Sequence, residues 1–326
     1  MRVGVASVAS MQGLVLRSVS GFFTVRLDAP LEDGRHTLTC KLRGKLKKER
    51  QKSELAVAGD RVEVEAASGE AEGVIVEVLE RRSWIVRREP GPRGKHFDDL
   101  VVANVDLLVI CGAATDPPLQ PGLVDRFLVA AELGHVHGVL AVTKRDALDD
   151  AGVDDAGAAS LREIVEVYRR IGVPVIETSA RTGLGVSALR EALTGKVAAF
   201  MGKSGAGKSS LLNALEPGLR LAVGEISDAS KKGLHTTRVA SLHPFGTGWL
   251  VDTPGLRELA LPTLEPATLT ALYPELAALG RCQFTDCRHE REPGCVVRRA
   301  IDAGALARGE LAQSRLDSFR KLLAAE

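Results

Sequence analysis

The sequence predicts a protein of three parts: a small all-β barrel, a central α/β domain with a mainly parallel sheet, and a helical C-terminal part that holds a metal site. Three observations support this division. The chain has 326 residues, whereas a single hydrophobic core stops growing near about 250–300 residues. Near residue 100 its pattern changes from short β-rich runs to alternating strands and helices. Three of its five cysteines crowd together near the C-terminus.

The first 90 residues alternate short β-rich runs with turns and show no helical periodicity, which favours a small antiparallel barrel. Five strands with a long basic loop fit an OB-fold, although the composition does not separate this barrel from an SH3-like one. The predicted strands are Gly13–Val19, Phe22–Leu27, Thr37–Leu42, Asp60–Glu65 and Gly73–Leu79.

Residues Glu89–Phe97 (EPGPRGKHF) collect proline, glycine and charge, which is typical of a linker. Buried-type strands and helical segments then alternate, which predicts an α/β domain with a mainly parallel sheet. Leu161, Val165 and Tyr168 belong to a stripe at steps of three and four that forms one face of a helix. The predicted strands are Leu100–Cys111, Val136–Val142, Val173–Ile176, Val197–Met201 and Trp249–Val251.

Hydrophobic residues make up 45% of the chain and charged residues 26%, values that exclude a wholly disordered or fibrous protein. The net charge of +1 argues against a protein that is basic throughout. It is a cancellation, however: residues 1–95 have five excess positive charges, residues 96–280 six excess negative charges and residues 281–326 two excess positive charges. Basic residues crowd between Lys41 and Lys52, which indicates a solvated loop or a contact for a phosphate backbone.

The segment Gly202–Ser209 (GKSGAGKS) fits the P-loop pattern GxxxxGK[ST] and stands between a predicted strand and a helix-like segment. Glycines let backbone amides curl around phosphate oxygens, and the helix N-terminus adds partial positive charge. Lys208 is expected to reach the β- and γ-phosphates, and Ser209 to bind Mg²⁺. The predicted nucleotide-binding residues of this segment are Gly202, Lys203, Ser204, Gly205, Ala206, Gly207, Lys208, Ser209 and Ser210.

About forty residues later, Asp252 and Gly255 belong to a DTPG sequence that follows an apolar strand. A carboxylate at a strand end can hold Mg²⁺ through water, and the glycine N–H can face a γ-phosphate. The polar segment before this strand ends in Thr236 and Thr237. Either threonine could bind Mg²⁺ and close on the γ-phosphate, which would make the segment a switch. We place Thr237 among the magnesium ligands, with Thr236 as the alternative.

Two further loops predict that the base is guanine. Thr143, Lys144 and Asp146 lie in a TKRD sequence at one strand end, and Ser179 and Ala180 lie in a TSA sequence at the next. These resemble the TKxD/NKxD and SA motifs of GTPases. The Asp146 carboxylate can accept hydrogen bonds from N1–H and the exocyclic amine of guanine, while Lys144 packs over the base and the Ala180 N–H donates to O6. Thr143 stands where many GTPases have asparagine, so we expect a weaker brace there.

The order of the motifs is permuted. Ordinary GTPases place the P-loop first and the base-reading motifs last, whereas here TKRD and TSA precede GKSGAGKS, which precedes HTT and DTPG. The same sheet can still form because the termini of a compact domain often lie close together.

A third group of residues follows the DTPG sequence. Cys282, Cys287, His289 and Cys295 have the composition of a closed tetrahedral site for structural Zn²⁺, with no open position for a reacting water. The sequence has no stretch near the ~20 uninterrupted apolar residues of a membrane span, and its N-terminus lacks a continuous apolar signal core. We therefore expect a cytoplasmic protein without membrane association.

With these motifs the chain resembles the ribosome small-subunit-dependent GTPase A family, RsgA, over nearly its whole length. The permuted motif order together with the Cys₃His set is far more specific than a P-loop alone. The resemblance implies an OB-fold RNA-binding domain at residues 1–90, a circularly permuted GTPase domain at 91–264 and a zinc-binding domain with C-terminal helices at 265–326.

The resemblance also implies an activity: hydrolysis of GTP to GDP and phosphate, stimulated by the small ribosomal subunit, in the late maturation of that subunit. GTP or GDP, Mg²⁺ and one structural Zn²⁺ would be the cofactors. The partners would be the small subunit and its rRNA, the latter contacted by the basic Lys41–Lys52 loop, and the protein would act as a monomer.

Leu256 follows DTPG where GTPases such as Ras place a glutamine that orients water, so we expect weak intrinsic hydrolysis. The resemblance implies that His235, just before the two threonines, positions the water, alongside Lys208 and Thr237 in the catalytic set. Two other interpretations stay open at this stage: an RNA-binding regulator that uses GTP mainly as a sensed ligand, and a P-loop ATPase with an incidental cysteine cluster, which TKRD and TSA disfavour.

Overall fold

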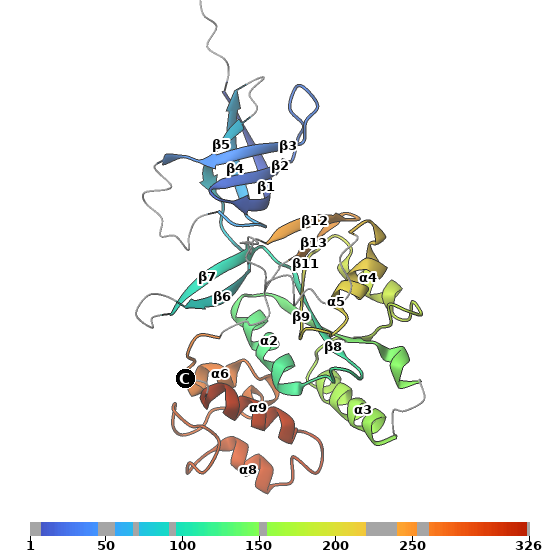
Figure 1. The fold of residues 1–326 in the computed structure, drawn as a ribbon. Helices are drawn as coiled ribbons and strands as arrows, with labels where there is room; N and C mark the ends of the chain where they lie inside the picture. Colours follow the sequence, from blue (N-terminus) through green and yellow to red (C-terminus); the bar gives the residue numbers. More distant parts are fainter. Residues whose placement is uncertain are drawn as a thin grey trace, which may run out of the picture.

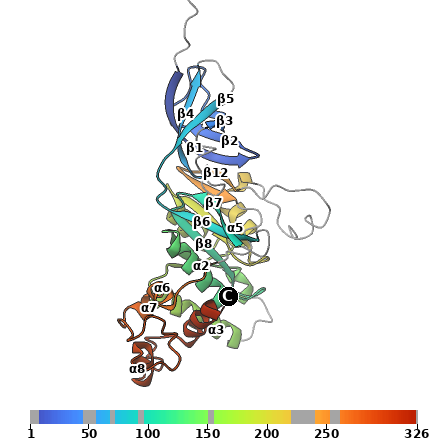
Figure 2. The same cartoon turned by 90° about the vertical axis from the view of Figure 1, so that its left-hand side faces the viewer.

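The computed structural model describes residues 8–44, 56–67, 72–90, 96–149, 155–219, 240–252 and 261–324. Figures 1 and 2 show a β-barrel at one end, a sheet flanked by helices in the middle and a group of short helices at the other end. This arrangement confirms the predicted fold class.

The N-terminal part is a closed five-stranded barrel. Its order is β1-β2-β3-β5-β4, and β4 pairs back onto β1. Strands β3 and β5 are parallel and the other neighbours are antiparallel. Alternate side chains such as Val15, Leu38 and Ile75 point inward and are almost fully buried. The strands are β1 (Val8–Val19), β2 (Phe22–Leu27), β3 (Thr37–Leu42), β4 (Arg61–Ala67) and β5 (Glu72–Val78).

The linker predicted at Glu89–Phe97 is wrong at both of its ends. Strands β6 (Trp84–Pro90) and β7 (His96–Ala103) form an antiparallel ribbon, and residues 91–95 lie outside the described residues. The apolar residues that start β6 and end β7 supply strand propensity beyond the segment rich in proline and glycine. Pro90 ends its strand, where the missing N–H removes no interior bond of the ladder.

The predicted strand Leu100–Cys111 is also two strands. Strand β7 ends at Ala103, and β8 (Leu107–Ala113) begins after a turn. Asn104 adopts a left-handed conformation there, with φ of 52°. Its side chain accepts a bond from the Arg82 N–H and donates one to the Gly59 carbonyl, which holds the break between the strands in place.

The central sheet has the order β10-β9-β8-β11-β13-β12, with every neighbouring pair parallel except β12 and β13. The strand that leads into the P-loop, β11, therefore lies inside the sheet between strands from both ends of the domain. Strand β12 was not predicted, because Pro244 interrupts its pattern. The strands not yet bounded are β9 (His137–Thr143), β10 (Val175–Glu177), β11 (Val197–Met201), β12 (Ser241–Phe245) and β13 (Gly248–Asp252).

Helices cover both faces of this sheet. Phe127 and Tyr168 belong to a core on the side of α2 and α3, and Leu189 and Leu211 to a core on the side of α4 and α5. The helical stripe predicted around Leu161 is buried in the first core. The elements are α2 (Pro121–Leu133), α3 (Asp155–Arg170), α4 (Val186–Leu193), α5 (Lys208–Leu215) and the 3-10 helices η3 (Arg145–Leu148) and η4 (Pro217–Leu219).

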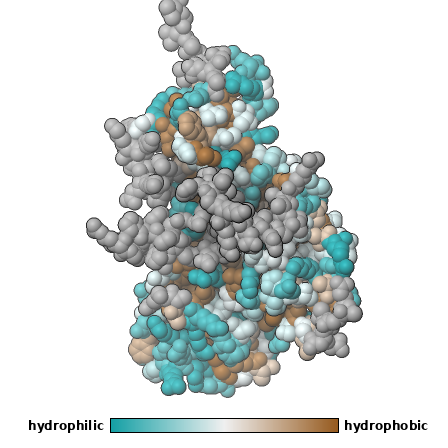
Figure 3. All heavy atoms as spheres, viewed as in Figure 1, coloured by the Kyte–Doolittle hydropathy of each residue, from teal (hydrophilic) through white to brown (hydrophobic). Residues whose placement is uncertain are grey.

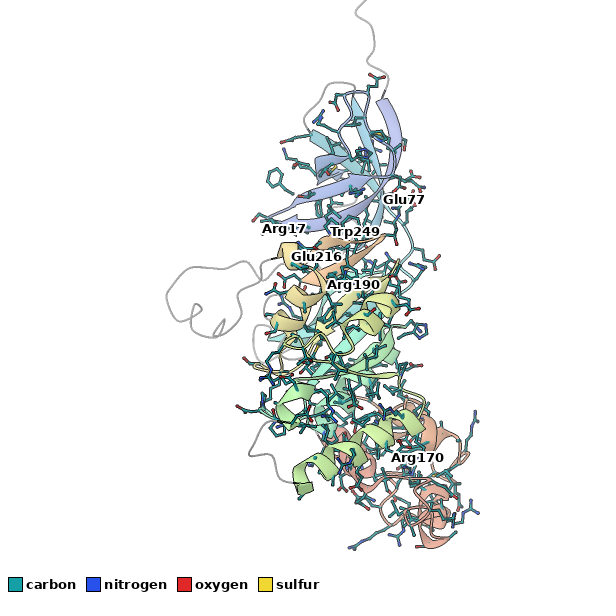
Figure 4. The ribbon with its side chains drawn as sticks, turned by 90° about the vertical axis from the view of Figure 1, so that its right-hand side faces the viewer. Arg17, Glu77, Arg170, Arg190, Glu216 and Trp249 are labelled. Atoms are coloured by element: carbon teal, nitrogen blue, oxygen red, sulfur yellow. The ribbon has the colours of Figure 1, made fainter. Side chains whose placement is uncertain are left out.

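The C-terminal part consists of short helices around the cysteine cluster, as predicted. Its core includes Val129 of α2, so it packs directly on the central domain. Arg170 at the end of α3 also donates to the Gly309 carbonyl (Figure 4). Hydrophilic residues cover much of this part on the face seen in Figure 3. The helices are α6 (Pro266–Ala271), α7 (Pro274–Ala277), α8 (Val296–Asp302) and α9 (Gln313–Ala324).

The barrel joins the central sheet through its first strand. Arg17 of β1 pairs with Ser241 of β12, and the Arg26 guanidinium lies 5.5 Å from the centre of the Trp249 ring. Figure 4 shows Arg17 and Trp249 together at this boundary. No helix among the described residues has the length and apolar character needed to cross a membrane.

Candidate nucleotide and metal sites

The P-loop has the backbone conformation that phosphate binding needs. Gly205 and Gly207 both have φ of 80°, a region that residues with a side chain rarely adopt. Lys208 begins α5, and its ammonium group donates to the Gly202 carbonyl at 2.7 Å and the Lys203 carbonyl at 2.8 Å. The lysine thus lies across the loop, where it can exchange a carbonyl for a phosphate oxygen.

Strand β8 and the loop after it lie very close to the P-loop. A Cβ atom at Gly202 would lie 2.2 Å from the Cys111 carbonyl oxygen at the end of β8, so only glycine fits there. A Cβ atom at Gly205 would lie 3.2 Å from Pro117 in the loop after β8. Cys111 itself is buried, and burial raises the pKa of its thiol to about 12, so this cysteine is an unreactive packing group.

Three of the predicted nucleotide-binding motifs, TKRD, TSA and the P-loop, meet at one edge of the sheet. The Thr143 hydroxyl donates to the Ala206 carbonyl of the P-loop at 2.6 Å. The Arg145 N–H donates to the Thr178 carbonyl at 3.1 Å, which joins the TKRD loop to the TSA loop. Thr143 therefore joins the base-reading loop directly to the P-loop through its hydroxyl, at the position where many GTPases have asparagine.

Hydrogen bonds to other parts of the chain hold the two residues that would contact the base. Lys144 has φ of 55°, and its ammonium group donates to the Asp116 carbonyl at 2.5 Å. Asp146 accepts from the Ser179 hydroxyl and from Arg181, and these bonds hold the pKa of its carboxyl below the usual value. Asp146 is therefore ionised at neutral pH, as acceptance of two guanine N–H bonds requires.

Asp252 ends β13 beside the strand that leads into the P-loop, because Val251 pairs with Ala199 of β11. Burial raises the pKa of this carboxyl, and nearby His243 opposes the rise. A divalent cation would favour the ionised form of such a group. Four other predicted site residues lie outside the described residues: His235, Thr236, Thr237 and Gly255.

The four predicted metal ligands form one compact group. Their ligand atoms all lie within 4.8 Å of one another. The Sγ atoms of Cys282 and Cys295 are 3.9 Å apart, and the His289 Nδ1 atom lies 3.4–3.5 Å from all three sulfurs. A tetrahedral zinc site requires about 3.8 Å between sulfurs and about 3.6 Å between nitrogen and sulfur. The geometry of the Cys₃His group therefore suits Zn²⁺.

A hydrogen bond from α6 fixes the tautomer of the histidine in this group. The Thr270 hydroxyl donates its one proton to the Pro266 carbonyl at 2.7 Å, so it must accept from the His289 Nε2–H, 3.0 Å away. The Nδ1 lone pair is then free to bind a metal among the sulfurs.

Three residues that support these sites were not among the predicted ones. Pro117 borders the P-loop, Thr270 orients His289, and Arg181 contacts Asp146. Arg181 directly follows the TSA motif, so its place in the sequence could have indicated a role at this site. No sequence pattern indicated Pro117 or Thr270, because their contacts come from packing between distant segments.

A P-loop at the centre of the sheet, guanine-reading loops beside it and a chain order that places those loops first define a circularly permuted GTPase. The chain matches the RsgA GTPase family over residues 78–262 and the RsgA N-terminal domain over residues 12–75. It belongs to the RsgA GTPase family and is a GTP-hydrolysing enzyme, and the family implies binding of GTP, GDP and Mg²⁺.

Relatives and solved structures agree with this assignment. The small ribosomal subunit biogenesis GTPase RsgA of Azotobacter vinelandii is 40% identical over 311 residues, covering 94% of this chain and 84% of the relative. The protein of the same name from a Geobacillus strain is 36% identical and covers 90% and 92%.

Among solved structures, YjeQ from Thermotoga maritima matches with a TM-score of 0.75 at 33% identity, covering 98% of this chain and 100% of that one. YloQ, described as a circularly permuted GTPase, matches with a TM-score of 0.71 at 27% identity and covers 99% and 97%.

Proposed function

We propose that this GTPase binds the small ribosomal subunit in the cytoplasm and acts in its late maturation, hydrolysing GTP when the subunit stimulates it. The convergence of the TKRD, TSA and P-loop segments at one sheet edge carries the guanine-nucleotide part of the proposal. The names of relatives that align over nearly the whole chain support the ribosomal part.

In this proposal the P-loop amides and Lys208 bind the phosphates, and Ser209 and Thr237 hold Mg²⁺, with Asp252 acting through water. Asp146, Lys144 and Ala180 read the base. Intrinsic hydrolysis is slow in this proposal because Leu256 has no group that could orient water. His235 positions the attacking water instead. The subunit then accelerates turnover by ordering the switch segment.

The remaining parts would attach the enzyme to rRNA. We propose residues 1–90 as the RNA-binding unit, 91–264 as the GTPase unit and 265–326 as a unit that Zn²⁺ stabilises, with the β6–β7 ribbon crossing the first boundary. The basic segment Lys41–Lys52 would contact rRNA phosphates, and the protein would act as a monomer. Residues 45–52 of it lie outside the described residues.

The test is GTP turnover by the purified protein with and without small ribosomal subunits. We expect slow hydrolysis of GTP alone, strong acceleration by small subunits and little turnover of ATP. Lys208→Ala should abolish both rates while the protein stays folded. Equal hydrolysis of ATP and GTP together with no effect of the subunit would refute the proposal.

A further inference from the structure

The guanine-reading carboxylate has a neighbour of opposite charge. Arg181 Nε lies 2.5 Å from Asp146 Oδ2, and the Ser179 hydroxyl donates to the same carboxylate. The Asp146 side chain is 14% exposed and the Arg181 side chain 62% exposed, so the arginine approaches the pair from the solvent side. Ser179 is fully buried.

A tight turn fixes the backbone that carries Arg181. The Thr182 N–H donates to the Ser179 hydroxyl oxygen at 3.1 Å, and the Gly183 N–H donates to the Ser179 carbonyl at 3.0 Å. The Ser179 N–H donates to the Leu184 carbonyl at 2.9 Å, which closes the turn. The position of Arg181 is therefore set by the same loop that presents Ala180 to the base.

The hydrogen-bonding capacity of the Asp146 carboxylate is shared between the chain and the base. An ionised carboxylate offers about four lone-pair sites. The Ser179 hydroxyl, the Arg181 Nε–H and the backbone N–H of Asp146 itself all contact this carboxylate. Guanine offers two donors on the edge that such a carboxylate reads, the N1–H and the exocyclic amine. These contacts hold the carboxylate in one plane, so that its remaining lone pairs can accept from the guanine edge.

We propose that Arg181 is a positioning residue for guanine recognition, which holds the Asp146 carboxylate in the plane that accepts both guanine donors. This rests on the proposed role of Asp146 in reading the base. An exposed ion pair contributes little to the stability of the fold, so we expect the contact to act on the selectivity for the base. A lysine at position 181 keeps the charge but presents it as a point, without a planar fork.

The test measures binding of GDP and inosine diphosphate to the full-length protein by calorimetry. Inosine diphosphate lacks the exocyclic amine, so it depends on one of the two contacts. We expect Arg181→Ala to weaken GDP binding about tenfold and inosine diphosphate binding about threefold or less, because GDP uses both contacts with the carboxylate and inosine diphosphate uses one. Arg181→Lys should restore part of the lost selectivity.

Two controls separate this inference from the proposed function. Arg299→Ala removes an exposed positive charge from the C-terminal part and should leave both affinities unchanged. Asp146→Asn should lower the preference of the protein for GDP over inosine diphosphate strongly; if it does not, the proposed base-reading role of Asp146 fails.

If Asp146→Asn relaxes selectivity while Arg181→Ala binds GDP as tightly as the wild type, only the inference about Arg181 is refuted. Tighter binding by Arg181→Ala would show that the arginine blocks the carboxylate and would also refute it. An equal loss of affinity for both nucleotides would mean that Arg181 acts through charge alone, which contradicts positioning.

Discussion

At the scale of single residues, the hydroxyl of Thr143 joins the base-reading loop to the P-loop through its bond to the Ala206 carbonyl. We predict that Thr143→Val, which keeps the shape and removes the donor, lowers GDP affinity about three- to tenfold. The reason is that a buried hydrogen bond contributes about 0.5–1.5 kcal/mol, and the carbonyl left behind loses its partner. Calorimetric titration with GDP measures the effect.

Thr143→Ser is the matched control, because it keeps the donor and should retain most of the affinity. Unchanged GDP binding by the valine variant would mean that Lys144 and the turn after β9 hold the two loops together without this bond.

At the scale of elements, helix α6 supports the metal group through one side chain. We predict that Thr270→Val lowers Zn²⁺ affinity about 10- to 100-fold, the effect of removing a partner that orients a metal-bound histidine. The variant leaves the His289 Nε2–H without its acceptor and the ring without a fixed tautomer. Competition with a chromogenic zinc chelator measures the affinity.

Thr270→Ser should behave like the wild type in this competition, because it keeps the hydroxyl. Zinc affinity that is equal in all three proteins would show that the three thiolates hold the ion without help from the second ring nitrogen.

The strands also show which elements a sequence pattern can predict and which it cannot. Strand β11 has the predicted bounds, because its apolar run stands directly before a motif that must end it. The β6–β7 ribbon was missed, since proline, glycine and charge around residues 89–97 hide two strands whose apolar residues lie further out. Strand β12 was missed for a similar reason: Pro244 near its end interrupts the pattern, while β13 supplies its hydrogen bonds.

The sequence predicted those parts of the sites that a local motif encodes. The P-loop, the base-reading loops and the Cys₃His group consist of residue types whose spacing reflects the ligand, and the structure brings the described members of each group together. Contacts such as that between Thr270 and His289 depend on how a helix docks, which leaves no local pattern in the sequence.

At the scale of the whole molecule, one buried arginine joins the C-terminal part to the central domain. Arg315 of α9 donates to Asp125 of α2 at 2.6 Å and makes two bonds to Glu275 of α7, at 2.7 and 3.1 Å. Its guanidinium lies 4.1 Å from the centre of the Tyr273 ring, and Tyr168 of α3 donates to the same Asp125 oxygen at 2.7 Å. Arg315 and Asp125 stand 190 residues apart in the chain, so no sequence pattern predicted the pair.

We predict that Arg315→Met weakens the attachment of the C-terminal helices by about 3–5 kcal/mol, because it leaves the Asp125 carboxylate buried without a positively charged partner. The loss should appear as faster hydrogen exchange of the α9 amides, with the β8 and β11 amides unaffected, since local opening is measured separately from global unfolding. Lys321→Met, which removes an exposed charge from the same helix, should change α9 exchange by less than about 0.5 kcal/mol. Slow exchange of α9 in both variants would mean that apolar packing of Phe319 and its neighbours holds the two parts together without the ion pair.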